Sequence, residues 1–77
     1  MINIRIDGLA PDIEKRIING WPAINRYYLP NGSLVITCSN CTVDPTTRVV
    51  LLDFFNGTCQ NRITLYAGEY RRVVKFS

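Results

Sequence analysis

Residues 48–55, which read Arg-Val-Val-Leu-Leu-Asp-Phe-Phe, constrain the fold more than any other stretch of this sequence. Successive side chains of a β-strand point to opposite faces, so positions 49 and 51 would share one face and positions 50, 52 and 54 the other. Valine and phenylalanine favour a pleated surface, and the Asn56-Gly57 pair that follows predicts a turn. We therefore expect a strand that is apolar on both faces and needs cover on both sides.

The length of 77 residues predicts a single β-rich domain, residues 1–77, near the lower size at which a hydrophobic core suffices. The hydrophobic fraction of 47% is ordinary for a globular protein and argues against disorder. Two sources of cover for the second face of the strand stay open. Either a helix of the same chain covers it, or the chain self-associates or docks on a larger partner.

The net charge of +3 is mildly basic, so it permits an acidic partner without requiring one. No apolar run approaches the ~18 residues that a membrane-spanning helix needs, and we expect no membrane partner. Residues 1–5 alternate apolar and polar side chains instead of forming the apolar core of a secretion signal. We expect the protein to be cytoplasmic or part of a virion assembled inside a cell.

A short helix is predicted at residues 11–19. Pro11 suits the first helical position, because the N–H that proline lacks would have no partner there. Ile13 and Ile17 would lie on one face of this helix, and Gly20 would close it as a left-handed cap. Two turns are not stable alone, so packing must hold them.

Besides residues 48–55, the alternation of apolar and polar side chains predicts strands at 2–7, 24–29, 33–38, 62–66 and 70–76. The turn Pro30-Asn31-Gly32 would join two of them in a hairpin, and Ala67-Gly68-Glu69 would join the last two in another. Residues 38–47 are expected to be irregular, with a turn at Asp44-Pro45. The predicted fold class is mainly β: a small antiparallel sandwich or barrel of about six strands with one short N-terminal helix.

The last third of the chain resembles the closing strands of immunoglobulin-like sandwich modules, through Val49 to Phe54, Ile63, Leu65, Gly68-Glu69, Val74 and Phe76. The opening strand and helix depart from the immunoglobulin pattern. In size and style the whole chain is similar to small phage virion proteins, such as capsid-decorating or connector subunits. This resemblance implies a structural or decoration component of a virion.

Three cysteines, Cys38, Cys41 and Cys59, are the most conspicuous chemical group. A structural zinc site needs four ligands, and the sequence has no histidine, so a carboxylate such as Asp44 or Asp53, or another chain, would have to supply the fourth. A redox dithiol favours a first cysteine at a helix N-terminus, whereas Cys38 ends a predicted strand. We favour free, partly buried thiols or a disulfide involving Cys59, with no metal or cofactor.

Catalytic groups are sparse. Histidine, the commonest general base, is absent, and the six carboxylates are scattered without a spacing that forces a pair. Asp53 interrupts the apolar strand, and we interpret it as marking the solvent edge of that strand. If it faced inward it would need a partner such as Arg62 or Arg48, because an unpaired buried charge is costly. The sequence predicts that the protein is not an enzyme.

Large aromatic residues are the candidates for protein–protein contact. We expect these interface anchors to be Trp21, Tyr27, Tyr28, Phe54 and Phe55. The leading hypothesis is a non-enzymatic structural or interaction module that acts through protein–protein contacts, as a homo-oligomer or in a larger assembly.

The C-terminal end supplies the alternative hypothesis, a small β-barrel that binds nucleic acid. A positive groove with aromatic stacking platforms would come from Arg62, Tyr66, Tyr70, Arg71, Arg72 and Lys75. Consecutive residues of a strand point to opposite faces, so Arg71 and Arg72 are not expected to share a patch. A solvated strand edge protected by cations explains these residues equally well.

Overall fold

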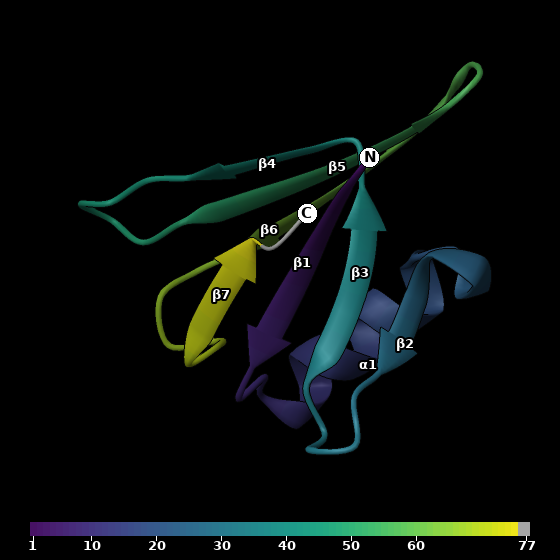
Figure 1. The fold of residues 1–77 in the computed structure, drawn as a ribbon. Coiled ribbons are helices and arrows are strands. Elements are labelled where there is room, and N and C mark those ends of the chain that lie inside the picture. Colours follow the sequence, from purple (N-terminus) through teal and green to yellow (C-terminus); the bar gives the residue numbers. More distant parts are fainter. Residues whose placement is uncertain (76–77) are drawn as a thin grey trace.

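Two antiparallel sheets and one α-helix make up the fold in this computed structural model, which describes residues 1–75, the side chains of Asn56 and Cys59 excepted (Figure 1). The four-stranded sheet has the order β2-β3-β1-β7, formed by Arg26–Tyr28, Leu34–Cys38, Ile2–Asp7 and Arg72–Lys75. The three-stranded sheet has the order β4-β5-β6, formed by Asn40–Val43, Val50–Asn56 and Cys59–Leu65. Helix α1 spans Pro11–Gly20, and a 3-10 turn, η1, spans Ala23–Asn25. The mainly β class with one short N-terminal helix is confirmed.

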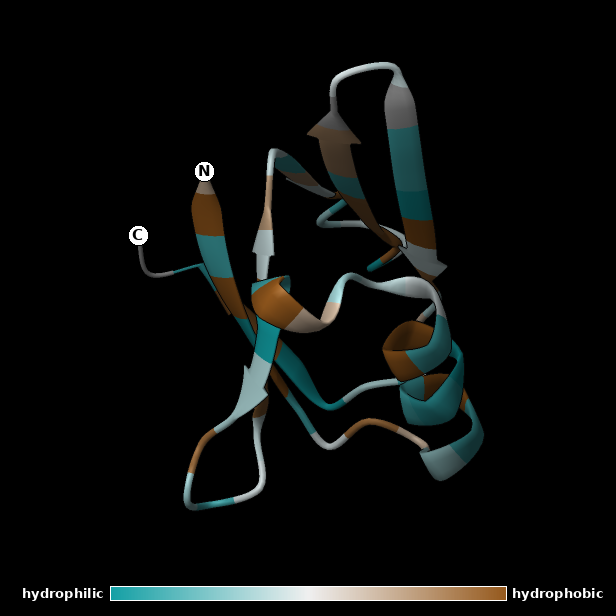
Figure 2. Cartoon of the chain, turned by 90° about the vertical axis from the view of Figure 1, so that its right-hand side faces the viewer, coloured by the Kyte–Doolittle hydropathy of each residue, from teal (hydrophilic) through white to brown (hydrophobic). Residues whose placement is uncertain are grey.

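The three-stranded sheet and α1 lie on the same side of the four-stranded sheet (Figure 2). Both contribute to one core, in which the fully buried residues include Ile6, Leu34, Leu52 and Leu65, with Ile17 from the helix. On the central strand β5, positions 50, 52 and 54 face this core, in agreement with the predicted alternation. The second face of β5 is turned away from the core, so α1 does not cover it.

Helix α1 begins at Pro11 as expected and runs to Gly20, one residue beyond the prediction. Ile13 and Ile17 are buried, and the N–H of Trp21 donates to the carbonyl of Ile17 at 2.8 Å. Gly20 does not adopt a left-handed conformation, so the predicted glycine cap is wrong. The chain instead leaves the helix in an extended conformation at Trp21, and the indole of this residue is buried in the core.

The predicted hairpin around Asn31-Gly32 is present between β2 and β3. Gly32 has φ +90°, and the side-chain Oδ1 of Asn31 accepts the N–H of Ser33 at 3.0 Å. The preceding strand is shorter than predicted, because Ala23–Asn25 form a 3-10 turn before Arg26–Tyr28 pair with β3. The turn residues therefore predict the hairpin correctly, whereas the predicted strand begins two residues before the observed one.

The prediction of an irregular segment at 38–47 is wrong, because Asn40–Val43 form the edge strand β4 beside β5. The turn at Asp44-Pro45 is present and makes this pairing a hairpin. The Oδ1 atom of Asp44 accepts the N–H groups of Thr46 and Thr47 at 2.8 and 3.1 Å. These bonds lower the pKa of the Asp44 carboxyl. The alternation in Asn-Cys-Thr-Val is weak, so only its pairing with β5 makes it a strand.

The predicted C-terminal hairpin is also wrong, because β7 pairs with β1 in the other sheet and not with β6. Gly68 does turn the chain, with φ +94°. After the turn, the carbonyl of Glu69 accepts the N–H of Ala10 and the N–H of Arg71 donates to the carbonyl of Asp7. These two hydrogen bonds hold residues 69–71 against the connection between β1 and α1. The chain therefore continues into the four-stranded sheet, where β7 pairs with β1.

Candidate functional site

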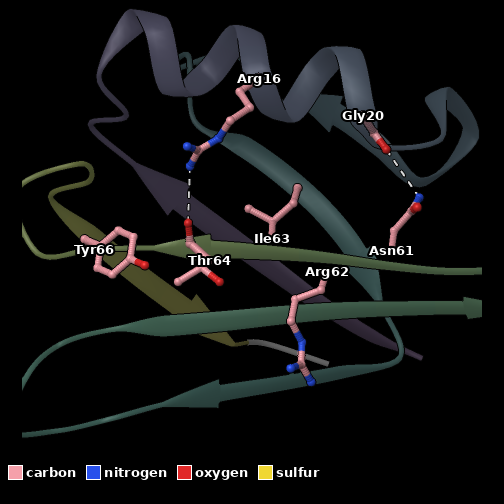
Figure 3. Close-up of a pocket in the computed structure, with 7 residues that line it drawn as sticks. All are labelled: Arg16, Gly20, Asn61, Arg62, Ile63, Thr64 and Tyr66. Carbon is pink, nitrogen blue, oxygen red and sulfur yellow. Dashed lines mark hydrogen bonds between the residues drawn. The ribbon is translucent and has the colours of Figure 1, made fainter.

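A pocket of about 470 Å³ lies between helix α1 and β6, the edge strand of the three-stranded sheet (Figure 3). The Arg16 Nη2 atom donates to the carbonyl of Thr64 at 3.2 Å, and the Asn61 Nδ2 atom donates to the carbonyl of Gly20 at 3.3 Å. These two side chains bridge the helix and the strand. We call the space the α1–β6 groove; it is lined by Arg16, Gly20, Asn61, Arg62, Ile63, Thr64 and Tyr66.

Alternate main-chain groups of β6 point into this groove. The carbonyl of Asp53 on β5 and that of Val49, just before β5, accept N–H groups from the β4 side, so these positions turn their main-chain groups away from β6. Every second residue of the strand behaves alike, so Leu51 turns its main-chain groups the same way as Asp53. On β6, Thr64 lies opposite Leu51, and Arg62 lies opposite Asp53. In an antiparallel ladder, opposed residues either exchange both hydrogen bonds or neither. The main-chain groups of Arg62 and Thr64 therefore face outward.

Arg16 gives the α1–β6 groove its charge, whereas the guanidinium of Arg62 is paired with Asp53 and points away from α1 (Figure 3). The side chains of Arg16 and Arg62 are both about half exposed, at 54%. Arg16 has Glu69 at 4.0 Å, the outer limit of an ion pair, and this carboxylate does not line the groove. Tyr66, 57% exposed, lies at one end. The groove thus combines one cation, an aromatic ring and the outward-facing main-chain groups of a strand edge.

Asp53 is buried at 3% exposure, so the interpretation of this residue as a solvent-edge marker is wrong. Arg62, its register neighbour on β6, holds it with two hydrogen bonds, 2.7 Å to Oδ1 and 3.3 Å to Oδ2. These bonds raise the pKa of the Arg62 guanidinium. The structure instead agrees with the other possibility, in which Asp53 is buried and paired with Arg62.

The outer face of the three-stranded sheet is the side that points away from the core. Its members, which share the parity of Asp53 and Arg62, include Thr42, Leu51, Phe55, Gln60 and Thr64. Phe55 is 49% exposed and Leu51 is partly exposed. The face therefore combines accessible apolar side chains with one neutral ion pair.

The residues predicted as interface anchors divide into two groups. Trp21 and Phe54 lie in the core, with ring centroids 5.8 Å apart, and the Trp21 Nε1 atom donates to the carbonyl of Thr37 at 3.2 Å. Their assignment as interface residues has to be corrected, because packing within the chain already occupies their surfaces. Tyr27, Tyr28 and Phe55 are each about half exposed, but they lie on different faces of the molecule.

Arg71 and Arg72 converge on one carboxylate, so the expectation that they cannot share a patch is wrong. Arg72 begins β7, whereas Arg71 lies in the preceding bend and escapes the alternation of a strand. Both reach the Oδ2 atom of buried Asp7, at 4.0 Å for Arg71 and 3.0 Å for Arg72. Arg5 lies 3.2 Å from Oδ1 of this carboxylate, and the Ser33 hydroxyl donates to it at 2.7 Å. The hydrogen bond from Ser33, followed by that from Arg72, lowers the pKa of Asp7.

The other residues of the predicted nucleic-acid set lie apart from this cluster. Tyr70 is buried at 6% exposure, its hydroxyl donates to the carbonyl of Arg48, and the Arg48 guanidinium covers its ring at 5.5 Å. Its ring is therefore not a free stacking platform. Arg62 and Tyr66 line the α1–β6 groove, and Lys75 lies exposed on the edge strand β7.

The cysteines for which side chains are described form no metal cluster. Cys38 is fully buried, its thiol donates to the carbonyl of Ile2 at 3.7 Å, and burial raises its pKa to about 11. Cys41 is a free, partly buried thiol whose pKa burial also raises. Cys59, and with it the zinc and disulfide hypotheses that need its thiol, lies outside the described side chains. Among the described residues, no group of three potential metal ligands occurs.

Sequence reasoning missed four polar residues that shape these surfaces: Arg5, Arg16, Ser33 and Asn61. Arg5 had a usable signal, since alternation places it on the same face as Asp7. Arg16 and Asn61 gave none, because their partners are carbonyl groups of residues more than forty positions away.

A scan against protein-family models and searches of curated proteins and solved structures find no match to this chain. Within residues 1–75, helices are too short and too polar to cross a membrane.

Proposed function

We propose that this chain is a non-enzymatic interaction module that associates with a second copy of itself through the outer face of the β4–β5–β6 sheet. The observation that carries the proposal is the accessible apolar surface of Phe55 and Leu51 on a face that the helix leaves uncovered. A chain of this length buries a smaller share of its surface on folding than a longer chain does, so further burial between copies adds useful stability.

Charge favours a second copy as the occupant of this face. The molecule as a whole has a net charge of +3, so two copies repel each other weakly. The outer face holds one cation and one anion, Arg62 and Asp53, which neutralise each other at 2.7 Å. Two such faces meet without a like-charge penalty, and apolar contacts between their Phe55 rings drive association.

Sedimentation equilibrium of three proteins tests the proposal. The wild-type chain is expected to dimerise with rising concentration, and Phe55→Ser is expected to weaken this association by about tenfold. Tyr27→Ser is the matched control, because Tyr27 is an equally exposed aromatic residue on the other sheet. A wild-type chain that stays monomeric, or equal weakening by both variants, would contradict the proposal.

A role in a larger assembly, such as the decoration of a virion, extends this proposal. Its support is the resemblance in size and style to small virion proteins, together with a neutral, apolar face suited to repeated contacts. The sedimentation experiment tests the self-association on which this extension of the proposal builds.

Nucleic-acid binding is the second candidate function, favoured by the convergence of Arg71, Arg72 and Arg5 around Asp7. Three cations share one carboxylate there, and Tyr27 lies on the same outer face of the four-stranded sheet, in the register row of Arg5. Phosphate contacts and a stacking tyrosine on one sheet face suit a single strand.

Fluorescence anisotropy with labelled single- and double-stranded DNA and RNA tests this candidate. Binding that weakens steeply between 50 and 200 mM salt, and falls further in Arg71→Ala, is expected. Arg71 is chosen because its side chain is 72% exposed and lies 4.0 Å from Asp7, at the outer limit of an ion pair. Undetectable or salt-independent binding would rule the candidate out.

A further inference from the structure

We infer that the α1–β6 groove binds an extended acidic peptide segment of another protein, which adds as a strand to the free edge of β6. This inference goes beyond self-association, since it concerns the edge of the three-stranded sheet and not its outer face. It rests on the geometry of the strand edge and on the charge of the groove.

The edge of β6 presents hydrogen-bonding groups at the spacing of a strand. Arg62 and Thr64 direct their main-chain N–H and C=O groups outward, two residues apart, as an incoming strand requires. The carbonyl of Thr64 accepts the Arg16 guanidinium, a charged side chain from the helix. An exposed side chain thus occupies a position where a neighbouring strand would donate an N–H group.

The side chains that line the groove select the occupant. Arg16 supplies the available positive charge, because its nearest carboxylate, that of Glu69, is 4.0 Å away, whereas the guanidinium of Arg62 is held by Asp53 at 2.7 Å and points away from α1 (Figure 3). On entry of a peptide, Arg16 releases the Thr64 carbonyl to a peptide N–H and turns its guanidinium to a peptide carboxylate. Tyr66, exposed at one end, and Ile63 in the floor contact apolar side chains of the same peptide.

A model peptide tests this inference on the full chain. The probe is an acetylated, amidated hexapeptide of alternating valine and glutamate, titrated into ¹⁵N-labelled protein to millimolar concentration. The expected result is a shift of the amide signals of residues 62–64 and of Arg16. A peptide with lysine in place of glutamate is expected to leave them unchanged. A glutamate peptide with proline at one of its two middle positions is expected to bind about tenfold more weakly, because proline lacks the N–H that a paired strand donates.

Two helix variants give the matched comparison. Arg16→Glu is expected to weaken binding of the glutamate peptide by about tenfold, whereas Lys15→Glu, an equal charge change on an exposed neighbour outside the groove, is expected to have a much smaller effect. Absent shifts, shifts confined to other surfaces, or equal binding of the lysine peptide would overturn the inference. Phe55→Ser keeps the groove, so peptide binding by this variant separates failure of the inference from failure of self-association.

Discussion

Arg62 holds the buried carboxylate of Asp53 across neighbouring strands, with Nε 2.7 Å from Oδ1 and Nη2 3.3 Å from Oδ2. Two parallel hydrogen bonds fix both groups in one geometry and leave the pair neutral. The pair lies on the outer face of the β4–β5–β6 sheet, where it adds no net charge to the proposed contact surface.

Loss of this arginine should destabilise the fold. Arg62→Ala leaves the Asp53 side chain, 5% exposed, without its cation, and we expect the midpoint of unfolding to move to a lower denaturant concentration. Denaturation in urea measures this change. In a double-mutant cycle, adding Asp53→Asn should cost less in the Arg62→Ala background than in the wild type. Additive losses would show that the pair does not interact.

Asp7 should make the stability of the fold decrease at low pH. Its pKa is held below the ordinary value of 3.8 by the Ser33 hydroxyl and by Arg72. The carboxylate form therefore stabilises the folded state above about pH 4, and this contribution is lost as the pH falls through the lower folded-state pKa. The melting temperature of Asp7→Asn should fall less steeply than that of the wild type between pH 5 and 2. Asp12→Asn, on the exposed side of α1, should keep the wild-type slope.

Gly8 and Gly57 form a matched pair for a steric test, because their φ angles are +62° and +61°. A Cβ atom at Gly8 would lie 2.7 Å from the Cβ of Arg71, whereas nothing lies within 4 Å at Gly57. Both alanine variants should lose about 1 kcal/mol to left-handed backbone strain. Gly8→Ala should lose more, because Arg71 must move and the contact of β7 with β1 loosens. Equal melting temperatures would contradict this packing.

The Cys38 thiol should resist alkylation in the native protein. It is fully buried and its pKa is about 11, so hardly any thiolate exists at pH 8. Peptide mapping after iodoacetamide treatment should find Cys41 modified faster than Cys38. In guanidinium chloride both thiols should react at similar rates. Rapid native labelling of Cys38 would mean that this end of β3 opens readily.

Local patterns predicted the elements better than their pairing. The isoleucine alternation in β1, Pro11 at the helix start and the Asn31-Gly32 turn each act over a few residues, and the structure contains all three. The partner of β7 depends on hydrogen bonds between residues 10 and 69 and between residues 7 and 71, which join the two ends of the chain. No local pattern encodes such a contact.

The candidate site was harder to predict for the same reason. Asp53 interrupts an apolar run whether it is solvated or paired, and the register that places Arg62 opposite it decides between the two. Trp21 and Phe54 are large aromatic residues, which suits an interface and a core equally. Their ring contact, at 5.8 Å, places them in the core.

The solution mass of the purified chain, measured by light scattering at several concentrations in low and high salt, tests the central claim most directly. Association through Phe55 and Leu51 is apolar, so we expect a dimer that persists at high salt, where charge repulsion is screened. A monomer at every concentration and salt, or an oligomer that dissociates as salt rises, would contradict self-association through the outer face of the β4–β5–β6 sheet.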